Sequence, residues 1–458
     1  MKRVLAAALA IVLFGALHSC ERTSGVTLEF WTLSLRPPFT SYIEGRIDRF
    51  EQDNPGVTIR WVDVPFHAVE RKLIAAAAAG RAPDVVNLSD MMFARFASRG
   101  AFIDLSEHLP DDASGRYHEG ALRIGRLGDE LEALPWYLTT QALIANEDVL
   151  ARGGLSPDTL ARTWDDLIDQ ARPFREQSGR FLFTQPLGED SQIPVMLLAE
   201  GIAPFREDAD GLLRADLTRP DVVAFVERWV DLYRSGAMPR QAATQGFEHL
   251  IDVYQNEQVA CLNTGVNFLR RVRDTSEPVY DSSVVLPPLT GSLGRAHVAV
   301  MPVSVSAQSA HPDVAARFAW FITSPESQLE FCRLATILPS TPGSLEDPLF
   351  AGPTDSERED GLDKVGYARA QSVRVLADAV AFTPAIEAWP EMRRAFNASI
   401  KSALLDGADV GEVLADIERR WNASIDEMNA RRAASGGVPA TLDAIPMPAP
   451  HAGGRLEP

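Results

Sequence analysis

The sequence is poor in the residues that most enzyme and metal sites require. Its 458 residues include only three cysteines and eight histidines, and none of these falls at the spacing of a zinc site or a redox pair. It has no Gly-x-Ser-x-Gly elbow, no His-Glu-x-x-His pair and no glycine loop for a phosphate. We therefore predict no catalytic residues, no metal site and no cofactor.

Basic residues are also in deficit. The chain has 44 Lys and Arg against 63 Asp and Glu, which gives a formal net charge of −19. This charge argues against a nucleic acid as the partner, because binding to phosphates relies on basic side chains. The remaining composition, 46% hydrophobic and 23% charged, is that of an ordinary soluble globular protein. The length predicts two domains.

The sequence has only one long apolar run, from Val4 to Leu17. It follows Lys2 and Arg3, is too short for a transmembrane helix and is typical of a secretory signal peptide. It ends in Leu17-His18-Ser19-Cys20, which resembles the Leu-x-x-Cys box of bacterial lipoprotein signals. That resemblance implies cleavage of residues 1–19, a lipid anchor on Cys20 and a tether over residues 20–25. An ordinary secretory signal cut nearby is the alternative.

Export would set the environment of the rest of the chain. Loss of residues 1–19 would take the formal net charge from −19 to −21. This acidity either suits a soluble body that an acyl anchor holds off an anionic membrane or only keeps the protein soluble. Outside the cytoplasm Cys261 and Cys332 could form a disulfide or remain as buried thiols, and the sequence leaves both open.

The stretch from Leu134 to Asn146 is the one around which we expect the chain to be organised. It has no helical period, its Trp, Tyr, Thr and Ile residues favour an extended chain, and Pro135 biases Leu134 away from helix. We predict a strand that crosses between two lobes, with a ligand cleft against it. The alternative is a buried core strand whose aromatic side chains only pack.

The chain before this stretch alternates strands and helices. Strands are predicted over residues 26–30, 57–64 and 82–88, each followed by a segment with helical spacing of apolar residues. Such alternation predicts a parallel sheet covered by helices, in which ligands bind at the C-terminal ends of the strands. Three such ends are expected, at Trp31–Arg36, at Asn87–Asp90 and near Trp136.

Short motifs in a fixed order extend over most of residues 26–430. They are Phe30-Trp31-Thr32, Phe50-Glu51-x-x-Asn54-Pro55-Gly56-Val57, Gly80-x-x-Pro83-Asp84-Val85-Val86, Asn146-Glu147-Asp148-Val149-Leu150-x-x-Gly153-Gly154-Leu155, Thr163-Trp164-Asp165-Asp166-Leu167, Pro287-Pro288-Leu289, the helix Ala315–Phe321, and Ser324-Pro325-Glu326-x-Gln328. In this order they resemble the extracellular solute-binding proteins of family 1. These are the sugar receptors of ATP-driven importers and are related to maltose-binding protein.

The resemblance implies an α/β fold with two lobes, the type II periplasmic-binding-protein fold. Each lobe would be a mostly parallel sheet flanked by helices, and hinge strands would join the lobes. Lobe 1 would comprise residues 26–138 and about 300–342, and lobe 2 residues 139–299 and about 343–430. Residues 431–458 are rich in Gly, Pro and Ala without period, so we expect them to be disordered.

The resemblance also implies a function. The protein would capture a carbohydrate or glycoside by closure of the lobes and deliver it to the transmembrane subunits of an ABC permease. It would act as a monomer outside the cytoplasm, anchored to a bacterial membrane through Cys20. No reaction would follow binding.

A sugar site needs flat aromatic faces for the apolar side of the ring and planar polar groups for its hydroxyls. We expect such groups on the loops that face the cleft and on the crossing strand, where alternate residues such as Gln141 share a face. The predicted ligand-binding residues are Trp31, Ser34, Arg36, Asn87, Ser89, Asp90, Trp136, Tyr137, Thr139, Asp190, Gln192 and Asn267.

Several of these residues have other interpretations. Trp31 could be core, Arg36 a solvated loop residue, Asp90 a helix N-cap, and Asp190 part of an exposed acidic turn. Asn267 stands where many relatives carry a stacking tryptophan, which favours a smaller or more polar ligand.

Other functions stay open at this point. Arg36 would suit an anionic ligand, such as a polyol phosphate or an acidic or sulfonated glycoside, and the acidic loops would suit a polyamine. A secreted hydrolase would need two facing carboxylates, which the sequence cannot place. A surface lipoprotein with a structural role is the remaining alternative.

Overall fold

The computed structural model describes residues 25–127, 130–246, 248–351, 364–376, 379–384, 386–434 and 437–447. The expected signal peptide and Cys20 lie outside these residues. Among the helices that are described, none combines the length and the hydropathy that crossing a membrane would require.

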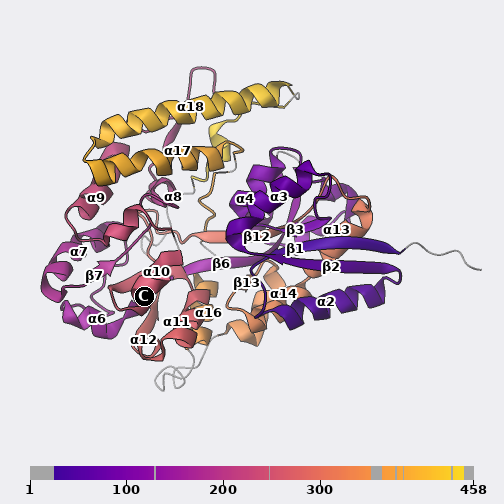
Figure 1. Ribbon diagram of the computed structural model, residues 1–458, viewed down its shortest axis with the longest axis horizontal. Helices are drawn as coiled ribbons and strands as arrows, with labels where there is room; N and C mark the ends of the chain where they lie inside the picture. Colours follow the sequence, from indigo (N-terminus) through magenta and orange to yellow (C-terminus); the bar gives the residue numbers. More distant parts are fainter. Residues whose placement is uncertain are drawn as a thin grey trace, which may run out of the picture.

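The centre of the molecule is a nine-stranded sheet that runs through both halves (Figure 1). Its main path has the order β2-β1-β3-β12-β6-β10-β7, and β11 and β13 also pair with β6. The strands are β1 (Val26–Leu33), β2 (Val57–Val64), β3 (Val85–Asn87), β6 (Ala133–Asn146), β7 (Phe181–Phe183), β10 (Val259–Gly265), β11 (Ser283–Leu286), β12 (Val298–Val305) and β13 (Leu338–Pro339). Two small hairpins, β4 (Arg126–Leu127) with β5 (Glu130–Leu131) and β8 (Phe205–Glu207) with β9 (Leu213–Ala215), lie off this sheet.

Helices cover the sheet on each lobe. In the first lobe they are α2 (Thr40–Asp53), α3 (Val69–Ala78), α4 (Asp90–Ala97), α5 (Glu119–Ile124), α13 (Pro312–Ile322) and α14 (Pro325–Leu334). In α2 the apolar residues at helical spacing, Tyr42, Ile43, Ile47 and Phe50, are all buried. Helix α2 connects β1 to β2 and α3 connects β2 to β3, and both β2 and β3 pair parallel with β1, as the alternating pattern predicted.

The second lobe is larger and more helical. Its helices are α6 (Glu147–Arg152), α7 (Trp164–Ser178), α8 (Ile193–Ala199), α9 (Pro220–Arg234), α10 (Glu248–Gln255), α11 (Asn267–Thr275), α12 (Glu277–Asp281), α17 (Trp389–Lys401) and α18 (Val410–Ala434), with α16 (Lys364–Leu376) between the lobes. Short 3₁₀ segments are η1 (Phe66–Ala68), η2 (Leu105–His108), η3 (Ala113–Arg116), η4 (Arg240–Ala243), η5 (Pro342–Glu346), η6 (Pro348–Phe350) and η8 (Leu442–Ala444), and η7 (Ser402–Asp406) is a π-helix.

Strand β6 joins the two lobes, which confirms the predicted crossing strand. It is 14 residues long and pairs antiparallel with β12 through its first half and with β10 and β11 through its second. Leu138 belongs to a core of the first lobe, whereas Ala142 and Leu143 belong to cores of the second. With β12 as a second crossing, the chain has the type II arrangement of two α/β lobes on hinge strands.

The two remaining cysteines lie in different lobes. Cys261 is buried in the second-lobe core and Cys332 in a core of the first, and both are free thiols. The open choice between a disulfide and buried thiols is therefore settled in favour of thiols.

Two segments differ from the expected layout. Residues 437–447 belong to the stretch that we expected to be disordered, but Ala440 and Ile445 are buried in the second-lobe core. The Leu213 N–H also donates to the Ala440 carbonyl at 3.0 Å. Phe350 packs into the first-lobe core, beyond the limit of about 342 expected for that lobe. Both contacts are between segments far apart in sequence, so no local pattern could indicate them.

Candidate functional site

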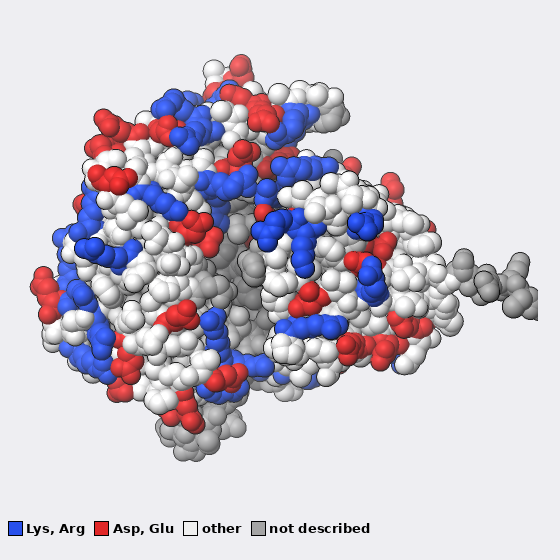
Figure 2. Space-filling model, in the orientation of Figure 1, with Lys and Arg blue, Asp and Glu red and all other residues white. Residues whose placement is uncertain are grey.

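A cavity of about 760 Å³ lies between the lobes, against the hinge strands. The first lobe supplies the loop between β1 and α2 and the segment between α14 and β13, and the second supplies residues of α7, α8 and α11. Figure 2 shows the surface hollowed between the two halves of the molecule. The volume falls in the range of sites for small organic ligands.

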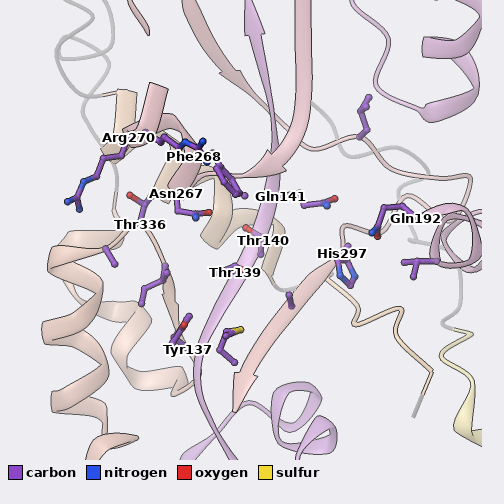
Figure 3. A pocket seen from close by; sticks show the side chains of 18 of the residues that line it. Tyr137, Thr139, Thr140, Gln141, Gln192, Asn267, Phe268, Arg270, His297 and Thr336 are labelled. Atoms are coloured by element: carbon purple, nitrogen blue, oxygen red, sulfur yellow. The ribbon is translucent and has the colours of Figure 1, made fainter. Parts of the chain in front are cut away.

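The floor of the cavity is one face of the paired hinge strands β6 and β12. Facing residues of an antiparallel pair project from the same side of the sheet. The facing pairs that line the cavity are Tyr137 with Met301 and Thr139 with Ala299. Gln141 and His297 also line the cavity, one residue beyond the last pair of this ladder, Thr140 with Val298. Figure 3 shows the labelled members of this floor.

The floor changes in character along its length. An aromatic ring and a thioether occupy one end, two small side chains the middle, and an amide and an imidazole the other end. The small middle pair, Thr139 with Ala299, leaves room above the sheet. A ligand with both apolar and hydroxyl-bearing surfaces, such as a sugar, would match this sequence of groups.

His297 is the titratable group of the floor. Burial lowers its pKa to about 4, a hydrogen bond to the Val380 backbone opposes this shift, and the positive charge of Arg393 adds to it. The imidazole is therefore neutral at physiological pH and acts as a hydrogen-bonding group without charge. Its ring packs against Phe382, with centroids 6.3 Å apart.

The walls carry aromatic and amide groups from both lobes. Aromatic residues that line the cavity are Phe39, Tyr137 and Phe331 from the first lobe and Trp164, Phe268 and Phe382 from the second. Polar residues are Ser34 and Thr336 on one side and Gln185, Gln192, Asn267 and Thr290 on the other. Charged groups are Arg270, Arg271, Arg295 and Asp274. No cluster of His, Cys, Asp or Glu in the described ranges is arranged to hold a metal ion.

The loop after β1 is held by one carboxylate. Asp63 on β2 accepts hydrogen bonds from the Thr32 hydroxyl at 2.7 Å, from the Leu35 N–H at 2.9 Å and from the Arg36 N–H at 3.0 Å. Ser34 within the loop has a φ of 52°, a conformation that non-glycine residues seldom adopt. The network around Asp63 fixes this backbone at the cavity wall.

Part of the predicted site lies where we expected it. Five of the predicted residues line the cavity, and they are Ser34, Tyr137, Thr139, Gln192 and Asn267. They come from the first loop, the crossing strand and two second-lobe segments. Contact of these side chains with a ligand remains a prediction.

The aromatic and loop residues of the first lobe are placed differently. Trp31 and Trp136 are buried in first-lobe cores, because each points to the face of its strand that packs against helices. Asn87 is fully buried, and its Nδ2 donates to the Pro302 carbonyl at 3.0 Å. Arg36 lies over the Trp61 ring at 4.0 Å and near Glu44 at 3.7 Å. None of the four lines the cavity.

Three further predicted residues lie at the contact between α4 and α17. Ser89 is the N-cap of α4 and accepts from the Met92 N–H at 3.3 Å. Asp90 follows it, is buried and has a pKa raised by burial to about 6. Asp190 has a left-handed backbone, with a φ of 53°. These residues lie outside the cavity, and the positive charge of the second-lobe Arg393 attracts the carboxylates of Asp90 and Asp190.

Several cavity residues were not in the predicted set. Gln141 could have been included, since it shares the face of Tyr137 and Thr139 by strand alternation. His297 could not, because its position depends on the pairing of β12 with β6, and no local motif specifies that register. Trp164 and Phe268 lie at the starts of α7 and α11, where their orientation depends on packing of the whole lobe.

Comparison with known sequences identifies the family. The family described as bacterial extracellular solute-binding protein matches residues 45–357. The chain belongs to this family, which agrees with the resemblance carried by its motifs.

Curated relatives are more distant. The chain is 23% identical over 347 residues to an uncharacterized lipoprotein encoded in the oleD 5′ region of Streptomyces antibioticus, covering 75% of this chain and 76% of that one. It is 24% identical over 224 residues to the arabinooligosaccharide-binding protein of Bacillus subtilis, covering 46% and 50%. The match to the candidate ABC transporter periplasmic-binding protein YcjN of Escherichia coli is 28% identical and spans 42% of that protein.

Solved structures share the fold over nearly their whole length. A candidate oligosaccharide periplasmic-binding protein from Synechococcus sp. MITs9220 has a TM-score of 0.79 and 32% identity, covering 88% of this chain and 99% of that chain. The GacH receptor of Streptomyces glaucescens, solved unliganded and with acarbose, has a TM-score of 0.71 at 21% identity, covering 88% and 99%. At that identity the second likeness shows the fold alone.

Proposed function

We propose that this protein is the substrate-binding component of an ABC importer and that it captures a short oligosaccharide or glycoside in the cavity between its lobes. The observation that carries the proposal is the cavity floor, whose side chains run from apolar to polar along the two hinge strands. Because the floor belongs to the strands that join the lobes, a ligand seated on it also touches both walls. Such a ligand would stabilise the closed arrangement.

The wall chemistry supports a carbohydrate. Aromatic rings from both lobes offer flat apolar faces to the C–H side of a pyranose or furanose ring. The amides of Gln185, Gln192 and Asn267 can each donate to and accept from neighbouring hydroxyls. The Synechococcus neighbour, at 32% identity, is described as a candidate oligosaccharide periplasmic-binding protein, and the Bacillus subtilis relative as an arabinooligosaccharide-binding protein.

The cellular setting forms part of the same proposal. The signal-like N-terminus and its Leu-x-x-Cys box support export and a lipid on Cys20. A receptor tethered outside the cytoplasm would bind the sugar without chemical change and pass it to the permease. We expect Cys20→Ser to release the protein from the membrane fraction into the soluble exported fraction, and unchanged fractionation would contradict the anchor.

The ligand class can be tested by a thermal-shift screen of the processed protein. We expect one class among maltotriose, cellotriose, xylotriose and arabinotriose to raise the melting temperature by several degrees, because selective binding stabilises the folded state. Titration calorimetry should then give a saturable affinity. Asn267→Ala should weaken it, whereas Asn256→Ala, on the exposed surface, should not. A screen in which no glycan shifts the transition would overturn the proposal.

A further inference from the structure

At the polar end of the cavity floor, the fold determines which side-chain groups can donate hydrogen bonds to a ligand. We infer that Gln141, oriented by Asn263, and His297 form a pair of hydrogen-bond donors that binds an oxygen of the sugar in its acceptor role. Such an oxygen is a hydroxyl oxygen, a ring or glycosidic ether oxygen, or the carbonyl oxygen of an acetamido group. The inference rests on the proposed sugar-binding function and specifies what one end of that site recognises.

The orientation of Gln141 follows from a backbone donor. The Leu289 N–H, which can only donate, lies 2.9 Å from Asn263 Oδ1. The other end of this amide, Asn263 Nδ2, must therefore be the group that lies 2.7 Å from Gln141. Since Nδ2 donates, Gln141 presents Oε1 to it. Gln141 Nε2 is then left for the cavity, which Gln141 lines.

Asn263 is a positioning residue and does not line the cavity. It lies on β10 and is 3% exposed, and strand β10 pairs with β6 so that Gly265 lies opposite Gln141. A buried amide with both ends hydrogen-bonded has no freedom to reverse without losing a bond in the interior. The fold therefore holds Gln141 with its Nε2 donor toward the cavity before any ligand binds.

His297 also presents a hydrogen-bond donor to the cavity, for a separate reason. The Phe382 N–H points to its Nδ1 at 3.5 Å, so Nδ1 cannot carry a proton without opposing one donor to another. In the neutral ring the proton is then on Nε2. Gln141 and His297 both line the cavity, one residue beyond the last pair of the β6–β12 ladder. Figure 3 shows both at the Gln192 side of the floor.

An exposed glutamine outside the cavity supplies the control. Gln52 lies on α2, is exposed and does not line the cavity. Changing Gln to Glu adds the same charge at either position. At Gln141 the change replaces a donor with an acceptor inside the cavity, whereas at Gln52 it alters no cavity group.

The experiment uses the processed protein and a panel of maltotriose, cellotriose, xylotriose, arabinotriose and N,N′,N″-triacetylchitotriose. The trisaccharide that gives the largest thermal shift is titrated against each variant. We expect Gln141→Glu to weaken binding about tenfold or more and Gln52→Glu to change it by less than about threefold. Equal losses in the two variants, or no loss in Gln141→Glu, would overturn the inference.

Asn263→Ala tests the positioning role. We expect this variant to weaken the same trisaccharide and the double variant with Gln141→Glu to be no weaker than Gln141→Glu alone, because the two changes remove one interaction. Circular dichroism at the titration temperature confirms that the variants are folded. A variant that is less stable but binds normally would show that Asn263 only supports the fold.

A readout without ligand separates this inference from the proposed function. In ¹⁵N-labelled protein, the His297 signals, assigned with His297→Gln, should show an unprotonated Nδ1 and a protonated Nε2. The reverse tautomer would overturn the donor pair even if sugars bind. If the tautomer is as expected and no glycan of the panel binds, the proposed function fails and the claim that the pair binds a sugar oxygen fails with it.

Discussion

Glu132 shows how a single side chain sets a pH dependence of stability. It is 2% exposed, and its Oε2 has no hydrogen-bond partner among the described residues. Burial raises its pKa from 4.5 to about 8, and the nearby charges of Glu130 and Asp104 add to the shift. The folded protein therefore keeps this proton at neutral pH, whereas the unfolded chain releases it above its ordinary pKa.

We expect Glu132→Gln to be more stable than the wild type at alkaline pH. The stability that the wild type loses between pH 4.5 and about 8 corresponds to as much as about 4 kcal/mol at pH 8, since each pKa unit is worth about 1.4 kcal/mol. Urea unfolding at about pH 5 and at pH 8 would measure it, with the exposed Glu107→Gln as a control. A difference between Glu132→Gln and wild type that does not grow with pH would contradict the assignment.

At the scale of the element, the loop after β1 depends on a side chain from the neighbouring strand. Asp63 accepts three hydrogen bonds from that loop and the end of β1, and the Thr32 hydroxyl in turn accepts from the Trp61 indole at 2.7 Å. The loop contributes Ser34, Leu35, Pro38 and Phe39 to the cavity wall. Stability and binding should therefore both respond to Asp63.

We expect Asp63→Ala to cost about 2–4 kcal/mol of unfolding free energy, because it leaves N–H groups of a fixed loop without their charged acceptor. It should also weaken the trisaccharide selected in the thermal-shift screen, because the wall formed by Ser34 and Phe39 loses its support. Denaturant unfolding and calorimetry would measure the two effects. The exposed Asp48→Ala should change neither, and normal binding by Asp63→Ala would show that the loop is not part of the site.

The elements also show what the sequence could predict. The apolar face of α2 and the extended nature of residues 134–146 follow from local periodicity, and both are confirmed. The same local reasoning failed to separate Trp136 from Tyr137, which are adjacent at a bulge of β6 and whose rings lie 5.4 Å apart in the same core, although of the two only Tyr137 lines the cavity. His297 and residues 437–447 depend on contacts between distant segments. A floor built from paired strands is visible only once their register is known.

At the scale of the whole molecule, the contact between α4 and α17 joins the lobes beside the cavity (Figure 1). Arg393 on α17 is 8% exposed, donates to the Ser191 carbonyl at 2.8 Å and contacts Met91 on α4. Asp90 lies in the same contact, and burial raises its pKa to about 6 against the opposing effects of the Met91 N–H, Arg393 and Thr383. If the lobes separate in the open state, Asp90 gains water and its pKa falls toward 3.8.

The pKa values of Asp90 in the closed and open states determine whether a lower pH favours closure or opening of the lobes. The closed state holds the Asp90 proton up to about pH 6 and the open state only up to 3.8, so lowering the pH between these limits favours closure. At about pH 5 the closed state gains about tenfold over its population ratio at pH 7.5. His297 stays neutral over this range, since its pKa is about 4.

We therefore expect sugar affinity to rise by up to about tenfold between pH 7.5 and about pH 5, with a matching decrease in the radius of gyration measured by X-ray scattering without ligand. Asp90→Asn cannot take up this proton, and the amide keeps the acceptor for the Met91 N–H. Its affinity and radius of gyration should be the same at both pH values. A wild type and an Asp90→Asn variant with parallel pH profiles would show that the α4–α17 contact persists in the open state and that closure turns on the hinge strands without separating these helices.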